Sequence, residues 1–229
     1  MNDRKESIKA ALIQAFPIAI SIAATGLSYG VLATQANLSL LEILGMSLLI
    51  FSGSVQFITV AMLSAGGSLL SILITTVLFN LRNILYGVAL SKGLAPAKKW
   101  RWLLYGGISD EPYVLSSARF KKVGPDPLFF GVVIGTFYIA LNSSVLIGAL
   151  IGNQVDPQKW GLDLAFTVTF AALLMPNLKG KPALATAVAA LIIAFSLEYF
   201  LPGNEFTIVI TGILAPFVGL YLQRGPGIQ

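Results

Sequence analysis

The chain contains no cysteine and no histidine, and only 11% of its 229 residues are charged. Without these two residue types there is no disulfide framework, and the commonest metal ligands and nucleophile–base pairs are missing. Most metalloenzyme and cysteine-protease functions are thereby excluded, so we expect no catalytic residue, no metal site and no cofactor. The absence of a G-x-x-x-x-G-K-[ST] loop also disfavours a nucleotide-driven pump.

Apolar residues take the place of charge, at 56% of the sequence and a mean hydropathy of +0.82. Soluble domains carry about 25% charged residues. Apolar stretches of about 20 residues, long enough to cross a bilayer, cover most of the chain. The sequence therefore predicts an all-α integral membrane protein with about six to seven transmembrane helices, including broken or re-entrant segments. We expect a single polytopic transporter domain over residues 1–229.

The net charge of +5 comes from Lys and Arg in connecting segments, so it reports membrane orientation and does not indicate nucleic-acid binding. Basic residues gather before the first span, about 10–36, and in the segment 92–105: Arg4, Lys5, Lys9, Lys92, Lys98, Lys99 and Arg101. Because cytoplasmic loops are enriched in Lys and Arg, this distribution predicts that both segments are cytoplasmic. Alternation of the later spans predicts a cytoplasmic C-terminus as well.

In this orientation the first span ends outside and the segment 92–105 lies in the cytoplasm. Residues 41–91 must therefore cross the membrane once, because two complete crossings would place the segment 92–105 outside. One part of the stretch must turn back. The candidates are the segment through Ser52-Gly53-Ser54 and the segment through Asn80-Leu81-Arg82-Asn83. A re-entrant or broken helix is tolerated only where its backbone is buried in protein or lines a cavity. Residues 106–120 are too short and polar to span, and form either an interfacial helix or a second re-entrant hairpin.

Further spans are predicted at about 127–151, 162–175, 182–201 and 206–223. Glycine pairs at four-residue spacing predict close helix packing: Gly26/Gly30, Gly131/Gly135 and Gly148/Gly152. Two polar stripes, one of them with Ser52 and Gln56 and the other with Asn80 and Asn83, recur at helical spacing. They serve either as interhelical hydrogen bonds, worth about 0.6 kcal/mol each, or as part of a transport path.

Five motifs occur together, in the order found in one family: Pro17–Gly30, Phe51–Phe57, Asn80–Gly87, Ser109–Tyr113 and Gly161–Asp163. Over nearly its whole length the chain resembles the AzlC/YgaZ/BrnF type of branched-chain amino acid permease. The resemblance implies export of leucine, isoleucine, valine and often methionine from the bacterial cytoplasm across the plasma (inner) membrane. It also implies a small AzlD/YgaH/BrnE-type membrane subunit as partner, while a homo-oligomer remains an alternative use of the small-residue faces.

Two positions depart from the family pattern. Ser52 stands where the family often has alanine in F-A-G-x-x-Q-F, and Asn83 stands where histidine is frequent. The second departure argues against a histidine-based proton relay in this chain.

A zwitterionic amino acid needs donors for its carboxylate, acceptors for its ammonium group and an apolar pocket. We expect Arg82 and N–H groups near Gly53 to meet the carboxylate, and amide side chains or broken-helix carbonyls to meet the ammonium. The expected substrate-binding residues are Tyr29, Ser52, Gly53, Ser54, Gln56, Asn80, Arg82, Asn83 and Tyr86. The alternative for Arg82 is a structural ion pair with Asp110 or Glu111. A channel using the same polar residues, without coupling, is the alternative function.

Proton coupling is expected at Asp110 and Glu111, because the chain has no histidine and a carboxylate must then carry the proton. Burial and a neighbouring anion both favour the protonated form of such a group, whereas an approaching Arg82 favours the charged form. The alternative reading of both acids is helix capping before Pro112.

Overall fold

The computed structural model describes residues 2–154, 156, 159, 178, 180–202, 204 and 206–223. The predicted span 162–175, with the Gly161–Asp163 motif, lies outside these residues. Regular structure in the described part is entirely helical, which confirms the predicted all-α membrane fold. Its helices are α1 (Asn2–Gln35), α2 (Leu40–Leu49), α3 (Gly53–Ser64), α4 (Leu69–Leu94), η1 (Ala95–Trp100), α5 (Arg101–Tyr105), α6 (Asp110–Val123), α7 (Pro127–Ile151), α10 (Lys181–Phe200) and α11 (Thr207–Gln223).

Four stretches of the described residues are long and apolar enough to cross a membrane: Arg4–Gln35, Leu69–Tyr105, Pro127–Ile151 and Lys181–Phe200. The chain divides into two compact units. Unit 1 comprises Met1–Val60 and Asn80–Asp163, and unit 2 comprises Ala61–Phe79 and Leu164–Gln229. In unit 2, α10 packs against α11, where Gly219 lies against Thr186. The prediction of a single domain over 1–229 stays a prediction.

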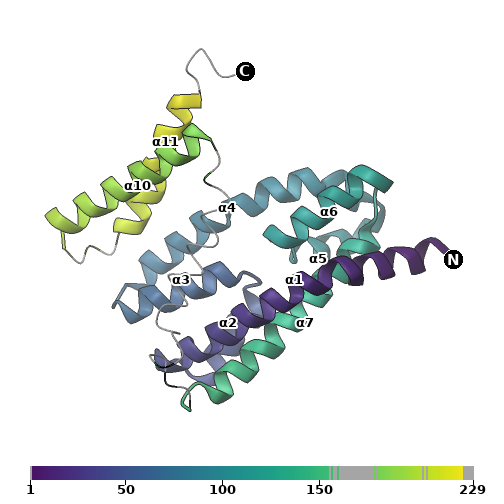
Figure 1. Ribbon diagram of the computed structural model, residues 1–229, viewed down its shortest axis with the longest axis horizontal. Coiled ribbons are helices and arrows are strands. Elements are labelled where there is room, and N and C mark those ends of the chain that lie inside the picture. The colour runs from purple at the N-terminus through teal and green to yellow at the C-terminus, as the bar shows by residue number, and fades with distance from the viewer. Residues whose placement is uncertain are drawn as a thin grey trace. The chain divides into compact units, whose positions relative to one another are not determined.

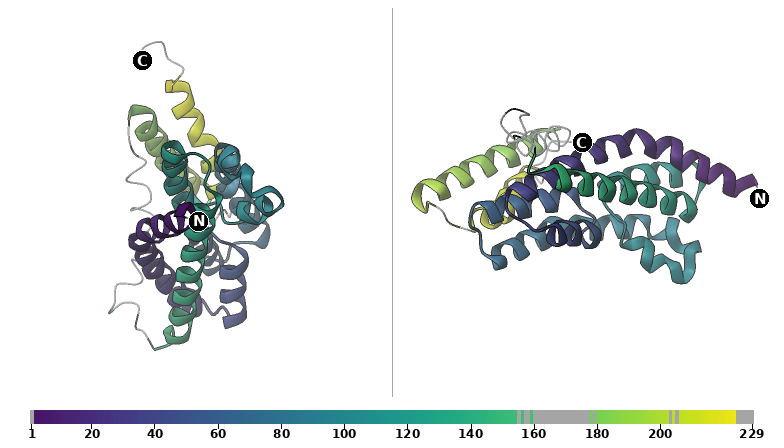
Figure 2. Two further views of the ribbon diagram at one scale, coloured as in Figure 1. Left: turned by 90° about the vertical axis from the view of Figure 1, so that its right-hand side faces the viewer. Right: turned by 90° about the horizontal axis from the view of Figure 1, so that it is seen from below.

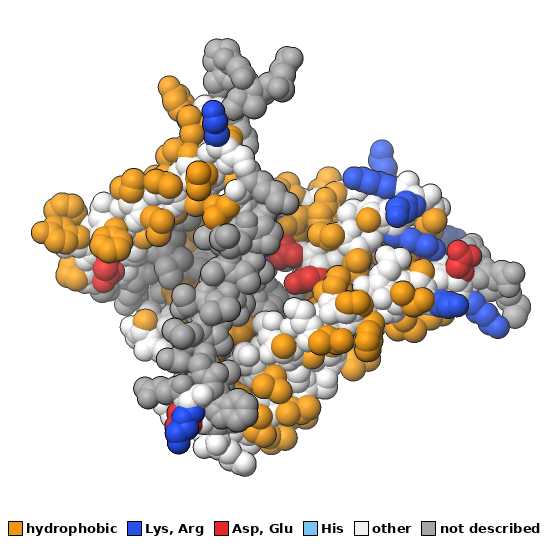
Figure 3. All heavy atoms as spheres, in the orientation of Figure 1, with side chains coloured by type: hydrophobic (Ala, Val, Ile, Leu, Met, Phe, Trp, Pro, Cys, Tyr) orange, Lys and Arg blue, Asp and Glu red, His pale blue; other side chains and the backbone are white. Residues whose placement is uncertain are grey.

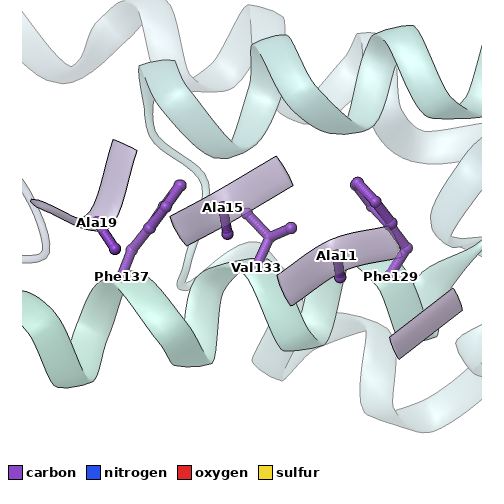
Figure 4. Packing of buried hydrophobic residues seen from close by; sticks show 6 residues of the cluster. All are labelled: Ala11, Ala15, Ala19, Phe129, Val133 and Phe137. Atoms are coloured by element: carbon purple, nitrogen blue, oxygen red, sulfur yellow. The ribbon is translucent and has the colours of Figure 1, made fainter. Parts of the chain in front are cut away.

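Unit 1 is built on the pair α1 and α7, which lie side by side in every view (Figures 1 and 2). Three small residues of α1 at four-residue spacing face three large residues of α7 at the same spacing, as Figure 4 shows: Ala11, Ala15, Ala19, Phe129, Val133 and Phe137. The residue numbers of both series increase in the same direction along the seam, so the two helices run parallel. Because alanine leaves room for each large side chain, the two helices pack closely along this apolar seam.

Glycines continue this seam toward the other end of the pair. A Cβ atom at Gly30 would overlap the carbonyl of Val145, and one at Gly148 would overlap the carbonyl of Leu27. The backbones therefore touch, which confirms the packing predicted for Gly26/Gly30 and Gly148/Gly152. For Gly131/Gly135 close helix packing stays a prediction: a Cβ built at Gly131 would meet the Leu104 side chain at 3.6 Å, and no described residue lies within 4 Å of one built at Gly135.

Helix α2 starts near the far end of this pair. Asn37 turns the chain with a positive φ of 63°, and Ser39 caps α2 in a capping box with Glu42. Hydrogen bonds from Ser39 lower the pKa of the Glu42 carboxyl. Ten residues reach only about 15 Å, half of a bilayer core of about 30 Å. The helix therefore ends at mid-depth, where Ile50 adopts extended dihedrals.

Helix α3 then folds back along α1. At the break, the ring of Phe51 lies 5.7 Å from the ring of Tyr138, near the middle of α7. Gly53 lies against Thr25 of α1, and the ring of Phe57 lies 5.9 Å from that of Tyr29. Both contacts advance by four residues on each helix, so α3 runs parallel to α1 and away from the break. Helices α2 and α3 thus form a re-entrant hairpin through the Ser52 segment, whereas residues 80–83 lie in the uninterrupted helix α4.

A second hairpin enters from the opposite end of α7. Leu104 of α5 lies against Gly131, and the next turn brings Gly107 against Ile134, so this arm runs parallel to α7, toward the C-terminal end of α7.

Helix α6 then runs in the opposite direction, beside α4 (Figure 1), with Asp110 at Arg82 and Phe120 packed against Gly93. Of the two predictions for residues 106–120, the structure shows the re-entrant hairpin.

Lys and Arg side chains gather at the end of unit 1 where α1 starts and α6 ends (Figure 3). One ion pair there is nearly buried: Arg119 Nε lies 3.2 Å from Asp126 Oδ2. Ser7 donates a hydrogen bond to the same oxygen at 2.8 Å, and the backbone N–H of Phe129 donates to Asp126 Oδ1. Asp126 therefore caps α7 and ties α1 and α6 to its start.

Candidate substrate site

The tip of the α2–α3 hairpin is polar and buried. Gln56 is fully buried, and its Nε2 donates to the carbonyl of Ile50 at 3.3 Å, across the break. Its Oε1 has no partner among the described residues, and neither does the buried hydroxyl of Ser47, one turn before the break. A buried acceptor without a partner costs about 1–3 kcal/mol. The fold thus maintains an unsatisfied polar group on each arm of the hairpin, within about one turn of the break.

Helix ends converge at the same tip. The first turn of α3 presents backbone N–H groups for which the helix has no preceding carbonyl acceptor. They belong to Gly53, Ser54 and Val55. The N-terminus of a helix carries partial positive charge and the C-terminus of α2 partial negative charge. Gly53 leaves space beside the first turn, since a Cβ built there would meet only Thr25, at 3.9 Å.

These features match the charged groups of an amino-acid zwitterion in chemical type. The α3 amides suit a carboxylate, and the oxygen atoms of Gln56 and Ser47, with the last α2 carbonyls, suit an ammonium group. The ring of Tyr29, which is fully buried against Phe57, and the ring of Phe51 supply apolar surface. Broken helices use both of their ends in this way at transporter substrate sites.

The tip of the α5–α6 hairpin is charged instead. Arg82 Nη2 lies 2.7 Å from Asp110 Oδ2, with both side chains about one-third exposed. The hydroxyl of Tyr86 donates to Asp110 Oδ1 at 2.9 Å, and the rings of Tyr86 and Tyr113 stack with centroids 4.2 Å apart. Asp110 therefore has a partner on each oxygen, and the structural ion pair expected as the alternative role of Arg82 is present.

Glu111 lies beside this pair and is half-buried. It follows Asp110 directly in sequence, so two carboxyl groups stand next to one guanidinium. Asp110 is held by that cation and by the Tyr86 hydroxyl.

The predicted site residues fall into three groups. Tyr29, Ser52, Gly53, Ser54 and Gln56 surround the first tip. Arg82, Tyr86 and Asp110, with Glu111 next in sequence, form the second. Asn80 and Asn83 lie one turn apart on α4 and bond to each other, Nδ2 of Asn83 donating to Oδ1 of Asn80 at 3.1 Å.

Sequence reasoning missed Thr25, Ser47, Tyr113 and Tyr138 as neighbours of the tips. Thr25 did carry a signal, because it falls on the polar face of the first span. The other three lie in apolar or mixed helical stretches, where only the three-dimensional contact distinguishes them from packing residues.

Half-spanning hairpins beside long apolar helices define an all-α integral membrane protein, built as membrane transporters are. Comparison with known families is specific: the AzlC protein family matches residues 17–155, which include both hairpins and all of α7. The chain belongs to the AzlC family, a family of transport proteins.

Three relatives illustrate the range of this similarity. The branched-chain amino acid transport protein AzlC of Bacillus subtilis is 26% identical, over 99% of this chain and 90% of that protein. An uncharacterized membrane protein of Helicobacter pylori is 30% identical, over 82% and 87%. The inner membrane protein YgaZ of Escherichia coli is 24% identical, over 92% and 89%. No solved structure matches the chain.

Proposed function

We propose that this protein is a secondary transporter that exports leucine, isoleucine and valine, and also methionine, from the bacterial cytoplasm. The observation that carries the proposal is the break between α2 and α3, where Gln56 Oε1 is buried without a partner among the described residues, beside the first backbone N–H groups of α3. An amino-acid zwitterion complements both. The Bacillus subtilis relative is a branched-chain amino acid transport protein, which supports the substrate class.

The orientation proposed here places the basic end of unit 1 in the cytoplasm of a bacterial cell, with the plasma membrane around the apolar helices. The α2–α3 hairpin then enters from outside and the α5–α6 hairpin from inside. With this arrangement the segment 92–105 is cytoplasmic without an additional crossing. The C-terminus is proposed to be cytoplasmic as well.

Coupling to protons is proposed for the second tip. Protonation of Asp110 would weaken its pair with Arg82, and the released guanidinium could then bind a substrate carboxylate bidentately. We propose Glu111, next to Asp110 in sequence, as the second acid of this step. We propose Arg82, with Tyr86, as the substrate contact of this second step, and Asn80 and Asn83 as its polar neighbours on α4.

The partner proposed for the complete transporter is a small membrane subunit of the AzlD/YgaH/BrnE type. Lipid-facing helices with small residues, such as the open side of α7 at Gly135, offer surface for such a subunit or for a second copy. The substrate assay below is therefore to be run with and without a co-expressed small subunit.

The test is counterflow of labelled leucine in proteoliposomes, comparing the parent protein with Gln56→Leu and Gln56→Glu. Leucine at Gln56 removes the acceptor at similar size, and the loss of one hydrogen bond to a charged group, about 1.5–3 kcal/mol, predicts a 10- to 150-fold weaker apparent affinity. Glutamate keeps an acceptor and should retain part of the binding. Thr59→Val is the matched control, one turn further along α3.

Two results would contradict the proposal. Normal leucine affinity in folded Gln56→Leu would remove Gln56 from the site. Absence of counterflow for every branched-chain amino acid, both with and without the small subunit, would remove the substrate class.

A further inference from the structure

The two hairpins stand in the same relation to the helices that precede them. A long helix, α1 or α4, is followed by a short arm, a break and a second arm. The short arms are α2, with 10 residues, and η1 plus α5, with 6 and 5 residues. The second arms, α3 and α6, have 12 and 14 residues.

The correspondence extends to single residues at a separation of 57 positions. Helix α3 begins at Gly53 and α6 at Asp110, each preceded by a serine, Ser52 or Ser109. At the same separation the sequence Tyr29-Gly30-Val31 recurs as Tyr86-Gly87-Val88. Three identical residues alone would be weak, but here they occupy the same place on α1 and α4 relative to the hairpin tip.

The contacts within each half also correspond. In the first half Thr25 meets Gly53, and in the second Arg82 meets Asp110; each pair is 28 positions apart. One turn further along the long helix, the corresponding tyrosines Tyr29 and Tyr86 each pack on an aromatic ring of the second arm. Their partners are Phe57 and Tyr113, which are 56 positions apart, one fewer than the tyrosines.

The directions of the two halves are opposite. Helix α1 runs parallel to α7, and its hairpin approaches from the C-terminal end of α7. Helix α4 runs with α6, which descends toward the start of α7, so α4 is antiparallel to α7, and its hairpin approaches from the N-terminal end. The tips reach α7 at Tyr138 and Ile134, about 6 Å apart along its axis.

We propose that residues 17–64 and 74–121 form an inverted-topology repeat, and that its two hairpins are gates on opposite faces of one site beside the middle of α7. Two halves related by a pseudo-two-fold axis in the membrane plane pack in the same way, so one hairpin can detach from its long helix while the other remains packed. The α2–α3 gate is held on α1 where Gly53 lies against Thr25, and the α5–α6 gate is held on α4 by the ion pair Arg82–Asp110. The gating rests on the proposed transport function; the repeat does not.

The repeat is tested by thiol labelling, which is clean because the chain has no cysteine. The corresponding variants Ser52→Cys and Ser109→Cys are labelled with a membrane-impermeant maleimide in intact cells and in inside-out vesicles. Asn153→Cys and Lys99→Cys calibrate the two faces. We expect Ser52→Cys to react from the side of Asn153→Cys, and Ser109→Cys from the side of Lys99→Cys.

Labelling of both serine positions from one face would overturn the inverted repeat. A second corresponding pair, Leu49→Cys and Gly106→Cys, is scored in the same way in case either serine variant fails to fold. If neither pair reacts from any face, the gates do not open to water and the proposal fails. No substrate is needed, so a wrong substrate assignment leaves this result unchanged.

Gating is tested by locking one hairpin. In Thr25→Cys/Gly53→Cys, oxidation with copper phenanthroline should form a disulfide that holds the α2–α3 hairpin on α1. We expect transport to fall at least tenfold relative to the same double variant before oxidation and to return to that level with dithiothreitol, while Ser109→Cys in the same background still reacts from the cytoplasmic face. Unchanged transport by the fully cross-linked protein would overturn the gate, and so would loss of the Ser109→Cys reaction.

Discussion

The two hairpin tips share a backbone plan but differ in charge. Around the α2–α3 tip the polar groups are hydroxyls, the Gln56 amide and backbone groups. Around the α5–α6 tip they are a guanidinium and two carboxylates. At corresponding positions the first half has Thr25 and Gly53, and the second has Arg82 and Asp110.

Because of this difference in charge, the two tips respond differently to pH. Neutral groups and helix ends keep their polarity at every pH, so the first tip offers a constant complement to a zwitterion. The second tip holds a salt bridge whose strength depends on protonation. A transporter needs both a binding surface and an element that senses the driving ion, and the two tips divide these requirements between them.

The largest effect on the comparison is expected from Arg82→Ala, which leaves Asp110 with only the Tyr86 hydroxyl. Hydrogen bonds to charged groups contribute about 1.5–3 kcal/mol, so export should fall about 10- to 150-fold. Arg82→Lys should recover little, because a point charge cannot replace a planar fork. Initial rates of leucine efflux from cells with matched expression would measure this.

Arg119→Ala is the matched control, since it breaks the other Arg–Asp pair of unit 1. That pair is nearly buried at the start of α7, so its loss should lower thermal stability in detergent while the folded protein keeps its efflux rate per molecule. Equal efflux losses in both variants would contradict the assignment of a transport role to one pair only.

Gly30→Ala and Gly87→Ala come next and compare the two halves at corresponding glycines. A Cβ at Gly30 would overlap the backbone of α7, whereas one at Gly87 would meet only the Ile108 side chain at 3.6 Å. We expect Gly30→Ala to destabilise by about 1–3 kcal/mol and Gly87→Ala to be neutral or stabilising. Thermal unfolding in detergent decides; equal shifts would contradict the described α1–α7 contact.

Tyr86→Phe and Tyr29→Phe compare the corresponding tyrosines with a smaller change. The first variant loses a bond to a partly exposed carboxylate, and we expect a cost of about 1 kcal/mol. The second loses only a 3.7 Å contact to the sulfur of Met46, a weak acceptor, and should be near neutral. Thermal unfolding measures both. A larger cost for Tyr29→Phe would reverse the comparison of the two tips.

The smallest change is expected from Glu111→Gln, in the pH dependence of leucine efflux. Glu111 follows Asp110 directly in sequence, so its ionisation places a second negative charge beside the Arg82–Asp110 pair, and glutamine removes that charge at similar size. We expect the pH at which efflux is half-maximal to differ between the variant and the parent. An unchanged pH profile would remove Glu111 from the coupling proposal.

Much of this fold was predictable from local signals. Asp126 before Pro127 marks the start of α7, and apolar length marks its end, so the predicted span 127–151 is confirmed. The charges in 92–105 predicted that one preceding segment turns back. They could not choose between the Ser52 and Asn80 segments, because both are polar; the structure places the break at Ser52.

The site was less predictable because its parts come from three distant segments. Sequence spacing showed Gln56 on a polar stripe but not the empty hydrogen-bonding position of its Oε1. It offered Asp110 and Glu111 equally as partners for Arg82, and only the geometry distinguishes them. The repeat could not be predicted from the sequence, because three identical residues, Tyr29-Gly30-Val31 and Tyr86-Gly87-Val88, are too few without the contacts around them.

The parallel seam between α1 and α7 has a consequence for biosynthesis. About 90 residues separate the end of α1 from the start of α7, which at about 5–20 residues per second is roughly 5–18 s of synthesis. During that interval Gly26 and Gly30 of α1 face lipid or another protein. Both hairpins, which rest on α7, must also wait for it. An insertion chaperone that shields the glycine face of α1 would therefore act before the seventh helix emerges from the ribosome.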